Sequence, residues 1–440
     1  MRPANQAVRH WERLFDQQQR READAAWLAN LRQAAFQRFT EAGFPRPRSQ
    51  GWRHTNTLPL ARVAFEVERE QATPVDLADL PAIEDTAARV VFVDGRYQET
   101  LSTLPDDRGA RVSSLAEALV SDAEGVRAYL GEDTESPNGS FVALNTAMMV
   151  DGAVVVVDPG VRLEAPIHLV FVTTATGTPA TTHLRNVVVA GRGSEVSVVE
   201  HYLGPDEDTY FNNAVTSVVC AKGSLLHHTR LQEEGADAWH IGEVRVHQAR
   251  DSRFTSFSLA VGARLSRTVI HTVLDGPGTE CALNGLYLGR DRQHVDHTTL
   301  VEHRSPHGTS RELYKGILDD QARGVFTGMV KVHPDAQKTN AEQNNRNLLL
   351  SDGAHVDSEP QLEIHADDVK CTHGSAIGRL DADALFYLRS RGLDTRQANV
   401  LLTRAFAGEL VNLVTHPGLR RAVDERVTAW LGRARFGREE

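Results

Sequence analysis

A cysteine and a histidine separated by one residue form the sharpest chemical feature of this sequence. Cys371 and His373 lie in the segment CTHG at 371–374. Side chains two positions apart on a β-strand emerge on one face, so a strand here would present a thiol and an imidazole together. Such a pair can bind soft or borderline metals or sulfur species, and a nearby imidazolium would lower the pKa of the thiol. From the residues alone, the alternative is a buried thiol beside a structural histidine.

A second candidate is a group of histidines in the segment 294–307. It contains His294, His297, His303 and His307, with Asp296 and Glu302 between them. On a strand, His297 and His303 have equal parity and would share a face. Imidazole and carboxylate ligands suit zinc or iron, so a metal site is one interpretation. The other is a set of polar side chains on one face of a repetitive β structure.

Several catalytic and nucleotide-binding motifs are missing from the sequence. It has no G-x-x-x-x-G-K-[ST] phosphate loop, no G-x-S-x-G elbow and no H-E-x-x-H. If the protein's work needs ATP, a partner must therefore hydrolyse it. The remaining cysteines, Cys220 and Cys281, lie in apolar runs and are expected in the core. Three cysteines so widely spaced favour neither a disulfide framework nor a C-x-x-C metal site.

Composition indicates a folded protein with a sizeable core. The chain has 440 residues, 41% of them hydrophobic, and a net charge of −11. An acidic chain is a poor candidate for nucleic acid, because phosphate neutralisation needs clustered Lys and Arg. No run approaches the roughly 20 apolar residues of a membrane span, and the N-terminus lacks an apolar secretory segment. We therefore expect a protein of the reducing cytoplasm, with no nucleic-acid or membrane partner.

The hydrophobic period changes twice along the chain. Trp27, Leu28, Leu31, Ala35 and Phe39 recur at helical spacing, and Gly43 is a plausible C-cap. From about residue 90 short β-branched runs alternate with turn signals, and 150–370 contains no convincing amphipathic helix. The absence of helical crossovers excludes an alternating βα fold.

Helical periodicity returns after residue 378. Asp381 is expected to cap one helix, Asp394 and Gln397 to form a capping box for a second, and Pro417 to begin a third. The second helix is expected to have an apolar face made of Leu401, Leu402, Ala405, Phe406, Leu410, Leu413 and Val414.

These patterns favour a mainly β protein with a solenoid core between two helical regions. A sandwich or a propeller would also consist of strands and turns, but no repeat of the propeller kind is visible. We expect an N-terminal helical region with a linker at 1–75, a β-helix core at 76–378 and a C-terminal helical domain at 379–440. The polar run 340–345 is predicted to form turns whose amides stack from coil to coil.

The C-terminal half closely resembles a known family, the SufB/SufD proteins of the SUF iron–sulfur cluster assembly machinery, in its SufD branch. The resemblance rests on the segments SRELYKGI (310–317), VHPDAQKT (332–339), NLLLS (347–351), PQLEI (360–364), DDVKCTHG (367–374) and FYLRSRG (386–392). Support further back comes from GWRHT (51–55) and ALNTA (143–147), followed by Asp151 and Gly152. With these segments included, the resemblance covers nearly the whole chain.

Two departures separate this chain from the SufB branch. SufB proteins have a glutamate on each side of the histidine that corresponds to His373, whereas the flanking residues here are Thr372 and Gly374. SufB proteins also have a cysteine in the strand that corresponds to 344–350, and this chain has none there. These differences argue against a cluster scaffold that acts alone.

The resemblance implies a fold, partners and a site. The fold would be a right-handed parallel β-helix between helical regions. The β-helix would join this subunit to SufB, and SufC ATPase subunits would bind to the C-terminal helices. His373 and Cys371 would be metal ligands that help to bind iron or a transient iron–sulfur cluster at the SufB interface, with no cluster held stably by this chain alone. ATP-driven movement of SufC would open that interface. The subunit would be a non-catalytic scaffold, able to form homodimers in isolation.

Three other functions remain as alternatives. The chain could be purely a structural platform for SufB and SufC, without a ligand role. It could be a solenoid enzyme acting on polysaccharide, although such enzymes need carboxylates or Ca²⁺ ligands in a groove and usually a secretion signal. It could also be a free-standing metal enzyme that uses the histidines of 294–307.

Overall fold

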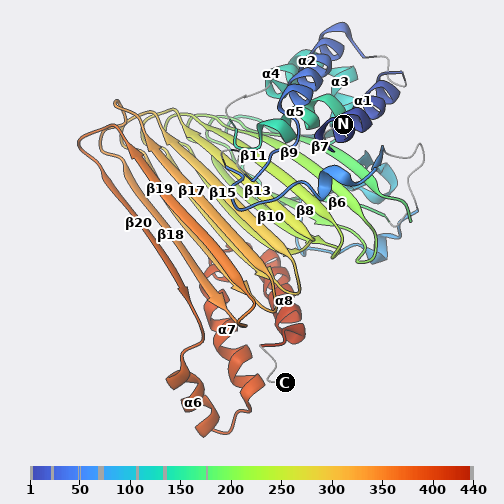
Figure 1. Cartoon of the computed structure of the whole chain (residues 1–440). Coiled ribbons are helices and arrows are strands. Elements are labelled where there is room, and N and C mark those ends of the chain that lie inside the picture. The colour runs from blue at the N-terminus through green and yellow to red at the C-terminus, as the bar shows by residue number, and fades with distance from the viewer. Residues whose placement is uncertain are drawn as a thin grey trace.

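The structure, a computed structural model, describes residues 3–20, 24–47, 49, 51–67, 74–105, 109–131, 136–174 and 177–436. Two ten-stranded sheets form the walls of a β-solenoid of about eight turns, with helices near both termini (Figure 1). The predicted mainly β, solenoid class is confirmed. No helix in the described ranges is long and apolar enough to cross a membrane.

From β5 onward the chain visits the two sheets alternately, so neighbouring strands in each sheet are two apart in the sequence. Sheet A comprises β4 (Ala110–Ser114), β5 (Ala153–Val157), β7 (Ala180–Ala190), β9 (Tyr210–Cys220), β11 (Trp239–Gln248), β13 (Leu265–Leu274), β15 (His294–His303), β17 (Arg323–Val332) and β19 (His355–Ile364), with β1 (Glu66–Val67) beside β7. Sheet B comprises β3 (Arg96–Tyr97), β2 (Ala88–Val93), β6 (Ile167–Val172), β8 (Glu195–Leu203), β10 (Leu225–Glu234), β12 (Arg253–Gly262), β14 (Glu280–Gly289), β16 (Thr309–Leu318), β18 (Asn340–Leu349) and β20 (Lys370–Gly378).

Short turns, and no helices, connect the parallel strands from β5 to β20 in the described residues. Several turns have an aspartate with positive φ, at Asp251 (58°), Asp291 (55°) and Asp320 (53°). Aspartate tolerates this left-handed conformation better than most residues, which allows a sharp reversal without glycine. The turn signals in the sequence therefore correspond to the corners of the coils.

Alternate residues of each strand point into the solenoid, and we call each such set an inward row. In β18 the inward row is Ala341, Gln343, Asn345 and Asn347, all buried. The prediction that 340–345 forms turns is wrong, because these residues are the first six of β18. Their amides do stack against neighbouring coils, but inside the solenoid, where buried polar groups need hydrogen-bond partners.

The N-terminal helices cover part of the outer face of sheet A. They are α1 (Pro3–Gln19), α2 (Ala26–Ala42), α3 (Leu115–Ser121), α4 (Ala123–Leu130) and α5 (Gly139–Met148), and short 3₁₀ turns lie at η1 (Leu60–Arg62), η2 (Leu77–Asp79) and η3 (Glu99–Leu101). Trp11, Phe39 and Phe141 pack with the outward-facing Phe211 and Trp239 of the sheet. Gly43 ends α2 as predicted, with a φ of 65° and its N–H bonded to the carbonyl of Phe39.

Three C-terminal helices follow β20: α6 (Ala382–Ser390), α7 (Thr395–Val411) and α8 (Pro417–Arg433). The predicted caps are confirmed, since Asp381 accepts from the N–H of Ala384 and Asp394 forms a capping box with Gln397. Helices α7 and α8 pack on the outer face of sheet B, whereas α6 has no buried residue and extends away from the body (Figure 1).

The predicted apolar face of α7 is only partly the packed one. Leu410 is buried, but Leu401 and Leu413 are each 47% exposed. The buried residues of the helix are Ala398, Thr403, Ala407, Leu410 and Val411. Small residues on this face let the helix approach its neighbours closely, so two of the larger leucines remain outside.

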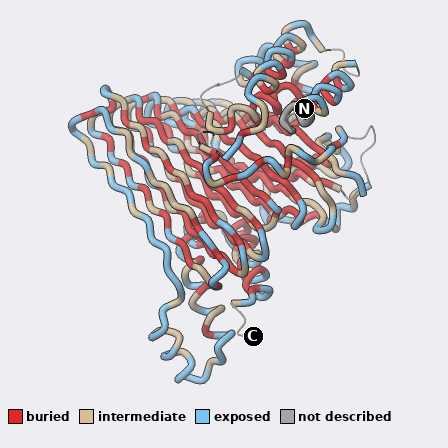
Figure 2. Tube along the Cα trace, viewed as in Figure 1, coloured by how far each residue is buried: buried red, intermediate tan, exposed pale blue. Residues whose placement is uncertain are grey.

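The coverage stops before the last coil of the solenoid. Figure 2 shows buried residues through the middle strands and mostly exposed or half-buried residues along β20. Strands β19 and β20 are the terminal strands of their sheets, so each has one edge that no strand in the described part of the chain covers. We call the end formed by β19 and β20 the open end.

We predict that truncating Leu410 unlocks the C-terminal helices from sheet B. Leu410→Ala should lower the free energy of unfolding by about 2–5 kcal/mol, because it leaves a cavity in a packed contact. Leu401→Ala, on the same helix but half-exposed, is the matched control and should cost less than about 1 kcal/mol. Urea denaturation measures both, and equal losses for the two variants would contradict this packing.

Candidate functional site

The last coil places Cys371 and His373 on one inward row at the open end. In the parallel register Cys371 pairs with Ala341 and His373 with Gln343, both of which are buried inward-facing residues. Ser375, next in the row, donates a hydrogen bond of 2.8 Å to Ser358 on the facing sheet, which shows that the row points inward. Because no further coil lies above, His373 is exposed and Cys371 only half-buried.

The structure gives Cys371 a different electrostatic setting from the one expected. Its side chain packs beside Val330, Val332 and Ala341. This burial raises the pKa of the thiol above its ordinary value, opposed by a hydrogen bond from the backbone of Ala341. The expectation of a lowered thiol pKa is therefore wrong for the free chain, in which Cys371 is protonated at neutral pH.

The other two cysteines lie in the core, as expected. Cys220 and Cys281 are fully buried in the interior of the solenoid. Burial raises the pKa of Cys220 to about 12 and that of Cys281 still further. Cys281 and Cys371 belong to the same column of in-register positions, through Ser310 and Ala341. Their exposure differs because only Cys371 lacks a covering coil.

A buried carboxyl lies two coils behind His373. Glu312 pairs in register with Gln343, which pairs with His373, so the three occupy one inward column. Burial raises the pKa of Glu312 to about 7, and hydrogen bonds from the side chains of Thr299 and Gln343 oppose this only in part. No cationic group among the described residues acts on the pKa of Glu312. An uncompensated buried carboxyl of this kind is typical of functional sites.

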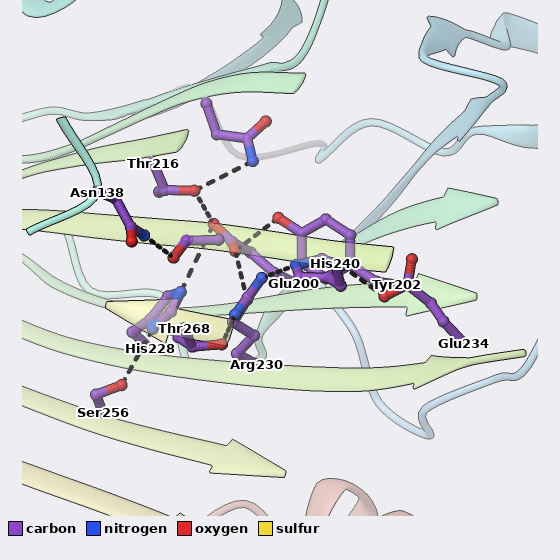
Figure 3. Close-up of polar contacts among 12 residues, drawn as sticks. Asn138, Glu200, Tyr202, Thr216, His228, Arg230, Glu234, His240, Ser256 and Thr268 are labelled. Atoms are coloured by element: carbon purple, nitrogen blue, oxygen red, sulfur yellow. Dashed lines mark hydrogen bonds and ion pairs between the residues drawn. The ribbon is translucent and has the colours of Figure 1, made fainter. Parts of the chain in front are cut away.

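A second buried glutamate, Glu200, is compensated and so differs from Glu312. Its carboxylate accepts hydrogen bonds from Thr216 (2.5 Å) and Tyr202 (3.0 Å) and lies 3.6 Å from His228 Nε2 and 3.9 Å from Arg230 Nε (Figure 3). Burial acts to raise its pKa, but His228 and Arg230 outweigh this and lower it to about 2. We interpret this network as a structural ion cluster, since its charges balance one another.

The histidines of 294–307 do not form a metal site. His297 and His303 do share the inward face, as predicted, but His303 Nε2 lies 2.9 Å from Ser310 Oγ while the ring of His297 packs against Tyr287 and Tyr314. His294 is on the opposite face and His307 in a turn with φ of 62°. Within the described residues, no group of three or more His, Cys, Asp or Glu side chains is arranged to hold a metal ion.

The carboxylate of that segment, Glu302, belongs to an ion-pair network on the outer face of sheet A. It lies 2.7 Å from His271, 3.2 Å from His333 and 3.0 Å from Arg304. These contacts, His271 first, lower the pKa of Glu302 to about 2. Its charge is satisfied within this group, so the network holds neighbouring strands together.

The motifs of the sequence do not single out Glu312 or Gln343 as site residues. Each lies within a segment that carries the family resemblance or beside one, but neither has a catalytic motif around it. The available signal was alternation: in the run Arg311–Glu312–Leu313–Tyr314, strand parity places Glu312 and Tyr314 on the same face. Parity alone does not say which face is inward.

Comparisons with known proteins place the site in context. The family model described as the SufBD core domain of SUF system FeS cluster assembly matches residues 171–406, and the SufBD protein N-terminal region matches 5–169. An iron–sulfur cluster assembly SufBD family protein of Synechocystis sp. is 34% identical over 88% of this chain and 87% of its own. Iron–sulfur cluster assembly proteins named SufD are 29% identical in Escherichia coli (96% of each chain) and 26% identical in Bacillus subtilis (90% and 92%).

The exposure of the three cysteines predicts selective alkylation. Under native conditions iodoacetamide should modify Cys371 and leave Cys220 and Cys281 unmodified. Because the thiol pKa of Cys371 is raised, its rate at pH 8 should be below that of a small free thiol and should still increase above pH 9. Mass spectrometry of tryptic peptides measures the rates, and a plateau already reached at pH 8 would mean a lowered pKa instead.

The two buried glutamates should have opposite effects on stability. The pKa of Glu312 is about 7 in the folded state and near 4.5 in the unfolded state. Its contribution to the free energy of unfolding is therefore complete below pH 4.5 and is lost as pH rises through 7. Glu312→Gln removes a carboxylate whose burial costs roughly 3 kcal/mol at pH 8, and the variant should gain stability relative to wild type between pH 5 and 8.

Glu200→Gln is the matched control for that comparison. It leaves Arg230 and His228 without their carboxylate, so it should destabilise the protein at pH 7 by roughly 3–5 kcal/mol. Urea denaturation across pH measures both variants. A loss of stability in Glu312→Gln that equals the loss in Glu200→Gln would show that the Glu312 carboxylate is compensated after all.

Proposed function

Because this chain belongs to the SufBD family of iron–sulfur cluster assembly proteins, we propose that it is a SufD-type subunit that helps to bind iron or a nascent cluster at the interface with a SufB partner. One observation carries the proposal. Cys371 and His373 are the thiol and imidazole of an inward row that no coil of this chain covers. The same row in earlier coils is closed off from solvent.

The chemistry of the two side chains suits iron as cargo. Thiolate sulfur and imidazole nitrogen are soft and borderline ligands that bind iron and iron–sulfur species. Binding requires Cys371 to lose its proton and His373 to be neutral. The raised pKa of the Cys371 thiol means that the metal must displace this proton, so the free chain does not hold a ready thiolate. With two ligands from this chain, the other coordination positions of the iron are left for ligands from a partner protein.

The open end supports SufB as that partner. Strands β19 and β20 have free edges with unpaired backbone N–H and C=O groups, which favour pairing with another strand. A second solenoid placed there would continue the sheets and enclose Cys371 and His373 between the two chains. In the absence of SufB, the same edges would favour a homodimer through the same end.

The C-terminal helices support SufC as the second partner. Large exposed apolar residues of this region are Phe386 and Tyr387 of α6, Leu401 of α7 and Leu413 just after α7. Helix α7 is tied to β16 by Lys315, whose Nζ donates to Glu409 (2.5 Å) and to the carbonyl of Phe406 (2.8 Å). Movement of an ATPase bound to these helices would thus be transmitted to sheet B, two strands from the open end.

A purely structural platform is the second candidate function, with the subunit having no ligand role. It is favoured by the protonated state of Cys371 and by the neutral residues Thr372 and Gly374 beside His373, which supply no further ligand. Whether it binds iron or serves only as a platform, the proposed subunit is a non-catalytic scaffold in the cytoplasm. SufC would then hydrolyse the ATP.

Co-purification with SufB and SufC under anaerobic conditions tests the ligand role. The wild type, His373→Ala, Cys371→Ser and the control Ser375→Ala should all form the complex. His373→Ala and Cys371→Ser should lose most of the bound iron and sulfide, while Ser375→Ala keeps both. Iron and sulfide are quantified per complex.

A normal iron and sulfide content in His373→Ala would leave only the structural platform. If His373→Ala fails to form the complex while Ser375→Ala forms it, the histidine is structural and the ligand role is refuted in its present form.

A further inference from the structure

The inward column behind His373 contains a side chain whose position fits a specific task. Gln343 lies between Glu312 on β16 and His373 on β20, in register with both. It is fully buried, and Glu312 is 2% exposed. Neighbouring parallel strands are about 4.8 Å apart, so the side chains of in-register residues on one face lie next to each other.

Glu312 fixes which end of the Gln343 amide is left without a partner. Gln343 Nε2 donates a hydrogen bond of 3.0 Å to Glu312 Oε1. Above its pKa of about 7 the Glu312 carboxylate is ionised and can only accept hydrogen bonds, so at pH 8 the nitrogen end of the amide faces Glu312. The oxygen, Gln343 Oε1, is buried and has no hydrogen-bond partner in the described part of the chain. A bare buried carbonyl oxygen costs free energy unless a donor reaches it.

The facing sheet leaves room for this amide at one glycine. Gly328 of β17 lies across the solenoid, and a Cβ added there would come within 2.2 Å of Gln343 Nε2. Any larger residue at 328 would displace the Gln343 side chain. Glu312 therefore holds the Gln343 amide by a hydrogen bond, and the amide fills the space that a side chain at position 328 would need.

The other two inward amides of β18 have no such free acceptor. Asn345 Oδ1 accepts from Asn347 Nδ2 (2.6 Å) and from Ser358 Oγ (2.8 Å). Asn347 Oδ1 accepts from the hydroxyl of Tyr287. Of these three amides, Gln343 is the one with an unused oxygen, and it is the one in the column of His373.

We propose that Gln343 is a positioning residue for His373: its amide oxygen accepts a hydrogen bond from one ring nitrogen and so directs the other toward a metal at the open end. The inference rests on the proposed ligand role of His373. A histidine that binds a metal commonly donates its second ring N–H to an oxygen acceptor, which fixes the tautomer and the ring orientation. Glu312 acts one step further back, by orienting Gln343.

Cobalt binding to the anaerobic complex with SufB and SufC tests this positioning role at pH 8. Co²⁺ alone is the probe, and its d–d absorption gives an apparent Kd. Gln343→Met keeps the volume but removes the oxygen, and it should weaken Co²⁺ binding by about 10–100-fold. Exchanging the two residues, Gln343→Glu with Glu312→Gln, restores an acceptor oxygen at 343 without placing two carboxylates side by side, and it should recover most of the affinity. Gln343→Asn, one methylene shorter, should behave like Gln343→Met.

Asn345→Leu is the matched control for a general loosening of β18. It removes an inward amide from the same strand but from the neighbouring column, and it should leave the Kd for Co²⁺ unchanged. An equal loss in Asn345→Leu and Gln343→Met, or no recovery in the exchange of Gln343→Glu with Glu312→Gln, would show a structural role and overturn the inference.

His373→Ala separates the two hypotheses. If His373→Ala loses Co²⁺ binding while Gln343→Met and Gln343→Asn bind as tightly as wild type, the ligand role stands and the positioning role is refuted. If His373→Ala binds Co²⁺ as wild type does, the proposed ligand role fails first, and the inference about Gln343 fails with it.

Discussion

The structure depends on one constraint of a solenoid. The inward side chains of a coil are shielded from solvent only where the next coil stacks on top of them. Through the middle of the chain this cover is complete, so inward side chains such as Cys281 and Glu312 are buried. At β20 it ends, and the same columns arrive at Cys371 and His373 with solvent above them. A position that is enclosed in every earlier coil thus becomes accessible to solvent in the last.

The interior of this solenoid is polar enough that charge balance decides what each buried group does. Glu200 has His228 and Arg230 beside it, and its pKa falls to about 2 in spite of burial. Only the neutral side chains of Thr299 and Gln343 act to lower the pKa of Glu312 among the described residues, and burial raises it to about 7. The two residues differ in their partners rather than in their depth. This contrast leads us to treat the Glu200 network as part of the fold and the column Glu312–Gln343–His373 as part of the site.

Much of the fold follows from local physical chemistry that the sequence displays. Two helices begin where the side chains predict it, α6 at Asp381 and α7 at the Asp394–Gln397 capping box. Helix α2 ends at Gly43, whose backbone freedom predicts that position. The strand runs and the absence of helical crossovers predict the solenoid class. The pair Cys371 and His373 could also be assigned to one strand face by parity alone.

The remaining features depend on tertiary context. Parity says that His297 and His303 share a face, but not that this face is the interior, where their rings have separate partners. The run 340–345 looks like turns because its amides are polar, yet neighbouring coils supply their hydrogen bonds within β18. Similarly, sheet B contacts the small residues of α7, so the larger Leu401 and Leu413 stay exposed.

The central claim is that the open end is a docking edge and the place where Cys371 and His373 become enclosed. Hydrogen–deuterium exchange of the free chain and of its complex with SufB tests this most directly. The account predicts that complex formation slows exchange most in β19 and β20, because their free backbone groups gain partners. A stable complex in which these two strands exchange as fast as in the free chain would contradict it.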